Sequence, residues 1–179
     1  AESGFTTAEL MLGSLYYKQG VGTKQDYKKA NEWLTKAANK GVPQALCNLG
    51  WSYYLGQGVS KNYSEALRLF SKATEKNYPD GYNGIAYCKF YGFGTKKNED
   101  EAISLINKAI ELSNNDNRFL DTKGEFYCKL GYVDKAKEIY EHIVNNDSTY
   151  YNGTSNSYLA GYFNNLQHID TDDNIPCTT

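Results

Sequence analysis

The sequence has few residues of the kinds that mark sheets, metal sites or membrane spans. Only three of its 179 residues are proline, and apolar residues do not alternate with polar ones as they do in half-buried strands. No stretch approaches the roughly 18 consecutive apolar residues of a membrane span. The two histidines and four cysteines include no Cys-x-x-Cys pair and are not spaced as zinc ligands. We therefore expect no sheet, no membrane span, no metal and no cofactor.

Catalysis finds equally little support. Neither His142 nor His168 lies in a recognisable nucleophile, metal or acid–base motif. The Gly-x-Gly segments follow predicted helices, whereas dinucleotide binding needs them after a strand. The formal net charge of −2 gives no reason to expect nucleic acid as a partner. The net charge becomes more negative towards the C-terminus. Two interpretations stay open: this charge gradient orients a charged partner, or the acidic end is simply a solvated surface. We expect a protein that is not an enzyme.

A unit of 36 residues recurs along the chain. Its register is shared by three sets of residues: the glycines Gly20, Gly56 and Gly92, the predicted caps Asp26, Asn62 and Asn98, and the alanines Ala37, Ala73 and Ala109. A fixed period of this size indicates a stacked repeat protein.

Each unit has the pattern of two helices joined by a glycine turn. In the second unit, Gly50 falls where the first helix needs a small residue against its partner. Gly56 and Gly58 then supply the positive φ angles that reverse the chain. Asn62 follows as the cap of the second helix, and Glu65, three residues later, completes the sequence of a capping box.

The pattern predicts helix pairs at 7–19 with 26–40, 44–55 with 62–76, 80–91 with 98–112, and 118–130 with 133–145. A capping helix is predicted at 157–166, followed by the acidic tail 167–179. Because the repeats follow one another without a long linker, we expect 1–179 to be a single repeat domain.

These units resemble the Sel-1-like repeat family, whose pattern is Leu-Gly, Tyr, Gly-x-Gly, an acidic or amide cap, Lys-Ala, and Lys-Ala-Ala closing on Gly. The match is close in 8–44 and 45–81 and looser in 82–117, where Ala86 replaces the first glycine. Residues 118–150 look instead like a tetratricopeptide unit. The resemblance implies an all-α, right-handed α-solenoid of antiparallel helix pairs, with a C-terminal capping helix, that serves as a protein-binding scaffold.

The cysteines depart from the cysteine-rich branch of that family, which ties the two helices of one repeat together. Cys47, Cys88 and Cys128 all fall in first helices, and Cys177 lies in the tail. Two alternatives stay open: three buried or groove-lining thiols with a loose Cys177, or a bridge that fastens the tail through Cys177.

Aromatic residues give the best clue to a binding site. The seventeen tyrosines exceed what four helix pairs need for packing, so some should be exposed. In tetratricopeptide-like stacks the first helices line the concave face, and Tyr and Trp are enriched in binding hot spots. The alternative is that several simply pack between neighbouring repeats. We predict the partner-binding residues Tyr17, Trp51, Tyr54, Tyr87, Phe90, Tyr91, Glu125 and Tyr162, centred on Trp51, Tyr54, Tyr87 and Phe90.

We expect a monomer that binds one specific protein partner in this aromatic groove. The first residues, Ala1-Glu2-Ser3, resemble the start of a processed exported protein or an arbitrary boundary. We therefore expect a periplasmic or secreted location, with a cytoplasmic one left open. Among exported bacterial proteins of this kind, one role is immunity against a secreted toxin or effector; the alternative is an adaptor in envelope assembly, signalling or host interaction.

Overall fold

The computed structural model describes Leu10 and residues 26–147, in which every regular element is an α-helix. Contacts divide the chain into two compact units, Ala1–Asn114 and Asn115–Thr179, called unit 1 and unit 2 below. The boundary falls in the polar loop before the tetratricopeptide-like segment. Apart from Leu10, the predicted helix 7–19 lies outside the described residues, as do the capping helix 157–166 and the tail. That 1–179 forms a single domain stays a prediction.

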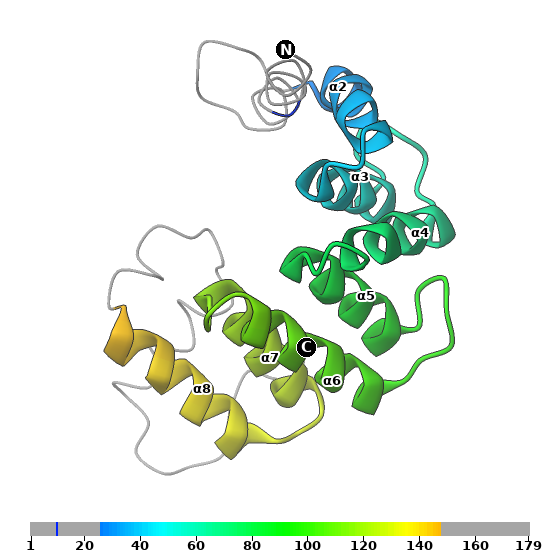
Figure 1. Cartoon of the computed structure of the whole chain (residues 1–179). Coiled ribbons are helices and arrows are strands. Elements are labelled where there is room, and N and C mark those ends of the chain that lie inside the picture. The colour runs from blue at the N-terminus through cyan, green and yellow to red at the C-terminus, as the bar shows by residue number, and fades with distance from the viewer. Residues whose placement is uncertain (1–9, 11–25, 148–179) are drawn as a thin grey trace. The chain divides into compact units, whose positions relative to one another are not determined.

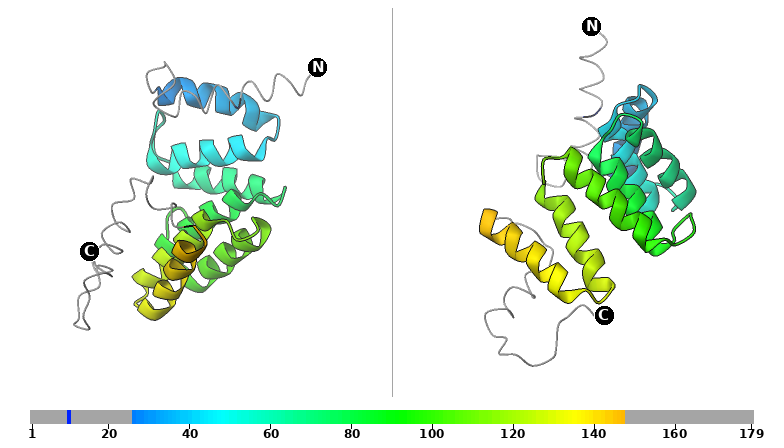
Figure 2. Two further views of the ribbon diagram at one scale, coloured as in Figure 1. Left: turned by 90° about the vertical axis from the view of Figure 1, so that its left-hand side faces the viewer. Right: turned by 60° about the horizontal axis from the view of Figure 1, so that its bottom comes forward.

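Unit 1 is a stack of helices that follow one another in space as they do in the chain (Figure 1). They are α2 (Tyr27–Asn39), α3 (Pro43–Leu55), α4 (Tyr63–Thr74), α5 (Pro79–Tyr91) and α6 (Glu99–Leu112). Each packs on the next, and α3 also packs on α5, so the first helices of successive repeats are in contact (Figure 2). In unit 2, α7 (Asn117–Lys129) packs on α8 (Val133–Asn146). The predicted helix pairs over these residues are confirmed.

Small residues let the helices of unit 1 approach closely. Ala66 and Ala73 are fully buried on α4, and Phe70, on the same helix, is also fully buried. The Phe70 ring lies against Gly50 of α3, where a β-carbon would come within 2.6 Å of it. Gly50 is therefore required to be small, as its position in the repeat predicts, because a packed interior cannot give way by that much.

The predicted caps form, but the capping box does not. The side chains of Asp26, Asn62 and Asn98 accept hydrogen bonds from backbone N–H groups three residues on, at 3.1, 3.0 and 3.0 Å. The N–H of Asn62 donates to the Tyr53 carbonyl at 2.9 Å instead of to Glu65. The Glu65 carboxylate accepts from the Arg68 guanidinium. The prediction of a reciprocal box was wrong because the tight turn brings a carbonyl of the first helix to the cap.

The glycine turns also join one repeat to the next. Gly56 and Gly58 have φ angles of +76° and +69°, which confirms the predicted positive φ. A β-carbon on Gly58 would lie 2.5 Å from the carbonyl carbon of Tyr27, in the preceding repeat. Gly94 approaches the backbone of Tyr63 in the same way, at 2.8 Å. The second glycine of each turn therefore allows close backbone stacking between repeats as well as chain reversal.

Candidate protein-binding site

Six half-buried aromatic side chains of unit 1 form a connected network. They come from α3, from the first residue of α4, from α5 and from the turn after α5. The members of this aromatic network are Trp51, Tyr54, Tyr63, Tyr87, Tyr91 and Phe93. All of them keep part of their surface open.

Four ring pairs of the network meet edge to face, and three are stacked. Trp51 contacts Tyr54 and Tyr87, with ring centroids 5.2 and 5.4 Å apart. Tyr87 continues to Tyr91 at 6.2 Å, and Tyr91 lies 5.7 Å from Phe93. The ring centroids of Phe93 and Tyr54 are 5.8 Å apart, so these contacts form a closed loop. Edge-to-face and offset contacts at these separations are the favourable ones for aromatic rings.

Two further contacts fix the network in place. Tyr63 is stacked on Phe93 with centroids 4.6 Å apart and ring planes 9° from parallel. Trp51 rests edge-on against the fully buried Phe70, at 5.1 Å. The network is thus tied to the core of the second repeat and presents rings whose rotamers are restricted by their neighbours.

The structure brings together four of the predicted binding residues, Trp51, Tyr54, Tyr87 and Tyr91. The prediction was wrong for Phe90, which is only 3% exposed and packs edge-on against Tyr91 at 5.1 Å. Phe90 occupies the repeat position that Tyr54 holds one unit earlier. Its ring carries no hydroxyl that needs a polar partner, so full burial is favourable there.

The other three predicted residues are not part of the described network. Tyr17 and Tyr162 lie outside the described residues. Glu125 is half-buried on α7, which belongs to unit 2.

Sequence reasoning missed Tyr63 and Phe93 because it considered only the first helix of each repeat. Tyr63 follows the Asn62 cap, and Phe93 is the middle residue of the next Gly-x-Gly turn. One repeat earlier, the corresponding pair is Tyr27 and Gln57, whose side chains lie 3.5 Å apart. The same contact therefore occurs in two successive repeats: the residue after a cap meets the central residue of the next glycine turn. Because both positions recur every 36 residues, the sequence could have revealed this pairing.

A lysine lies close to one ring of the network. The Lys61 ammonium lies 5.8 Å from the centroid of the Tyr63 ring, within the range of a cation–π contact. Among the described residues, no cluster of His, Cys, Asp and Glu could hold a metal ion. Within the same part of the chain, no helix has the length and apolar character needed to cross a membrane.

The buried thiols are part of the core rather than of this site. Cys47 and Cys88 are buried and Cys128 is half-buried. Cys177 lies outside the described residues, so neither alternative for Cys177 is tested. Burial raises the pKa of the Cys88 thiol to about 12. Burial, with a smaller effect of Asp80, raises the pKa of Cys47 still further. Both groups therefore stay protonated at neutral pH and are poor nucleophiles.

A family model for the Sel1 repeat matches residues 6–42, 43–78 and 79–114. The chain belongs to the Sel1 repeat family. Its three Sel1 repeats lie two or three residues earlier than the predicted units, and the matches end at the boundary of unit 1. Sel1 repeats mediate protein–protein interaction, and Sel1 repeat proteins are generally non-enzymatic scaffolds.

Solved Sel1 structures from bacteria are similar to the chain. A Sel1 repeat protein from Oxalobacter formigenes is 35% identical, with a TM-score of 0.59 over 75% of this chain and 54% of that protein. The protein c5321, a protective antigen present in uropathogenic Escherichia coli strains, is 34% identical, with a TM-score of 0.61 over 73% of this chain and 27% of that protein. The chain thus matches about half of one of these proteins and about a quarter of the other. No curated protein matches it.

Proposed function

We propose that the aromatic network is the surface through which this Sel1 repeat chain binds a protein partner. The observation that carries the proposal is the gathering of six partly open aromatic rings from two successive repeats into one connected set. Large aromatic side chains at the centre of an interface commonly dominate its binding energy. The membership of the chain in a family of interaction repeats supports the same conclusion.

The packing beneath the network favours tight binding. Trp51 is supported by Phe70, and Tyr91 by Phe90, both of which are buried. Rings held in this way lose little conformational freedom when a partner covers them, and pre-organisation of this kind increases affinity. Tyrosine hydroxyls add hydrogen-bonding groups at the edge of an otherwise apolar surface.

We propose further that the partner is a secreted toxin or effector, which the chain neutralises as an exported bacterial protein. A pre-organised aromatic centre suits the tight one-to-one complex that an inhibitor needs.

An adaptor is the second candidate function. It is supported by the family, because Sel1 repeats mediate protein–protein interaction, and binding of this kind does not require that the partner be inhibited.

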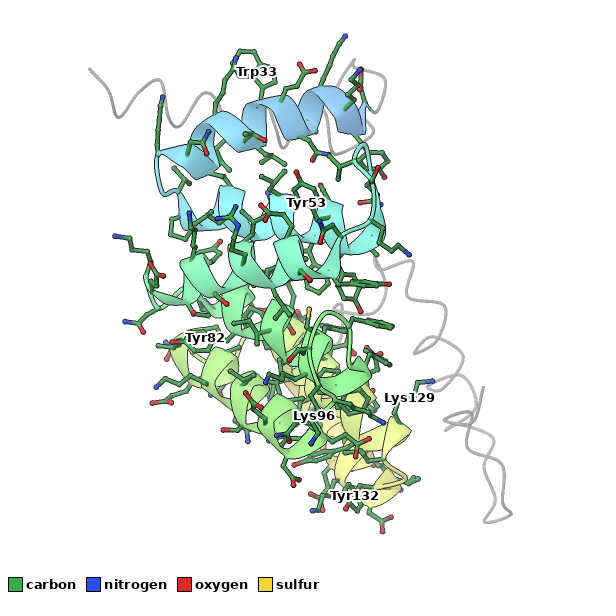
Figure 3. All side chains as sticks on the ribbon, turned by 90° about the vertical axis from the view of Figure 1, so that its right-hand side faces the viewer. Trp33, Tyr53, Tyr82, Lys96, Lys129 and Tyr132 are labelled. Atoms are coloured by element: carbon green, nitrogen blue, oxygen red, sulfur yellow. The ribbon has the colours of Figure 1, made fainter. Side chains whose placement is uncertain are left out.

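The test starts from the purified chain used as bait for proteins from extracts and culture medium of the source cells. Each captured protein is then produced alone, and its affinity is measured for the parent, for Tyr87→Ala and for Tyr82→Ala. Tyr82 is a matched control: it lies on the same helix but outside the network, and its hydroxyl donates to the Asn77 side chain at 3.3 Å. Figure 3 looks onto the side of unit 1 where Tyr82 lies.

The outcomes separate the candidate functions. A partner whose activity disappears in a one-to-one complex, and whose affinity falls with Tyr87→Ala only, supports the inhibitor. A partner that is bound through the network and stays active indicates the adaptor. Equal affinity for the parent and Tyr87→Ala would exclude the network as the binding surface. Cell fractionation with an antibody to the chain tests export separately.

A further inference from the structure

A second concave surface of unit 1 lies between the second helices of two successive repeats. It is a groove of about 340 Å³ between α2 and α4, and part of α3 forms its floor. Its apolar lining includes Leu46 and Leu49 of α3 and Leu69 of α4, all of them buried. Tyr53, also on the floor, is seen between the α2 and α4 ribbons in Figure 3. None of the lining residues belongs to the aromatic network.

Three cations follow the α4 side of the groove. Arg68 and Lys72 line it from successive turns of α4, about 6 Å apart along the helix axis, and Lys76 lines it from the turn just after α4. Two carboxylates also line it, Glu65 and Glu75. Glu65 is engaged by Arg68, and this hydrogen bond lowers the pKa of the Glu65 carboxyl. Among the described residues, neither Lys72 nor Lys76 is in an ion pair. With Glu75 counted as well, three cations and two carboxylates line the groove, and its net charge is +1.

The next repeat provides a comparison within the same chain. At the positions 36 residues on, Tyr82 replaces Leu46, and Lys89 replaces Tyr53. The ammonium group of Lys89, on α5, forms an ion pair with Glu101 of α6 at 2.9 Å. Ser104 and Leu112 replace Arg68 and Lys76. Lys108, Ile85 and Leu105 keep the character of the matching residues, so the two repeats differ at the positions of Leu46, Tyr53, Arg68 and Lys76.

We propose that this groove binds an extended acidic segment of a partner protein that carries aliphatic side chains. Carboxylates would meet Lys72 and Lys76, since Arg68 is already paired with Glu65, and aliphatic side chains would pack against the half-buried ring of Tyr53. The volume is large enough for a few side chains, whereas a whole helix about 10 Å across would not fit inside it.

The proposal is tested with a short fluorescein-labelled peptide of alternating Glu and Leu, and with the same peptide carrying Gln in place of Glu. Fluorescence anisotropy measures their affinity for the full chain. We expect the acidic peptide to bind at least tenfold more tightly than the Gln peptide. The variant K72E/K76E should bind the acidic peptide at least tenfold more weakly, and K72Q/K76Q should fall between the two.

The matched control is K96E/K97E, which makes the same change of net charge at exposed residues outside the groove. It should bind the acidic peptide like the parent, as should Tyr87→Ala, so failure here is distinct from failure of the aromatic proposal. Circular dichroism shows whether each variant keeps its helices. The proposal is overturned if the acidic peptide does not bind, if the Gln peptide binds equally well, or if K96E/K97E and K72E/K76E weaken binding alike.

Discussion

The ring of Phe70 occupies the space that a side chain on Gly84 would need. A β-carbon at Gly84, on α5, would lie 2.5 Å from two atoms of that ring. Gly50, on α3, faces the same ring. One fully buried phenylalanine of α4 is therefore held between two glycines of successive first helices.

We predict that Gly84→Ala destabilises the protein by about 1–3 kcal/mol, because the added methyl group overpacks the core against Phe70. Without this clash, alanine would stabilise the helix by about 0.5–1 kcal/mol relative to glycine. A loss of stability in Gly84→Ala therefore indicates the clash with Phe70. Urea unfolding measures the free energy. In a Phe70→Leu background the same change should cost less, and equal costs in both backgrounds would contradict the assigned contact.

The two glycines of one turn should differ in their sensitivity. Gly56 and Gly58 both have positive φ, so alanine at either is strained by about 1–2 kcal/mol. A β-carbon on Gly56 has ordinary contacts, the nearest atom lying 3.4 Å away, whereas one on Gly58 meets the backbone of Tyr27. Gly58→Ala should therefore lower the free energy of unfolding more than Gly56→Ala does. Similar losses would show that this backbone contact between repeats is not important. Gly56→Val should cost more than about 1 kcal/mol.

The elements could be predicted from the sequence because their signals are local. A cap such as Asn62 bonds three residues away, and the glycines of a turn act within one loop. Each of these signals recurs every 36 residues, which makes it easier to recognise. The reciprocal capping box failed because the competing carbonyl, that of Tyr53, belongs to the other helix of the repeat.

The site was harder to predict because burial depends on contacts between repeats. Tyr54 and Phe90 hold the same repeat position, yet only Tyr54 stays partly open. The Tyr63–Phe93 stack joins the start of α4 to the turn after α5, in the next repeat. The periodicity of a single helix cannot predict such a contact. The groove between α2 and α4 depends on side chains from three helices, whereas the sequence argument considered only first helices.

The buried thiols should make the protein less stable in alkaline solution. The pKa of Cys88 is raised from its ordinary 9.0 to about 12 in the folded chain. Between these values the unfolded thiol releases its proton while the folded one keeps it, so folding loses about 1.4 kcal/mol per pH unit. Chemical unfolding from pH 7 to pH 10.5 should show a steeper fall above pH 9 for the parent than for Cys88→Ala. Identical slopes would show that Cys88 is not buried in its neutral form.

The last prediction separates binding from packing within the aromatic network. Trp51 touches Phe70 as well as Tyr54 and Tyr87, so Trp51→Ala should lower both the melting temperature and the affinity for the partner. Tyr87 contacts Trp51 and Tyr91, which are themselves only half-buried. Tyr87→Ala should therefore affect stability less, while it lowers affinity by roughly 2 kcal/mol, as a central aromatic anchor does.

The control for both variants is Tyr82→Ala, which removes the same side chain from α5 outside the network. It should leave affinity unchanged. Calorimetric titration and thermal unfolding on the same samples give the two quantities independently. If Trp51→Ala and Tyr87→Ala lose stability but bind the partner as the parent does, the aromatic rings serve only to pack the repeats together. The partner must then use another face of the chain.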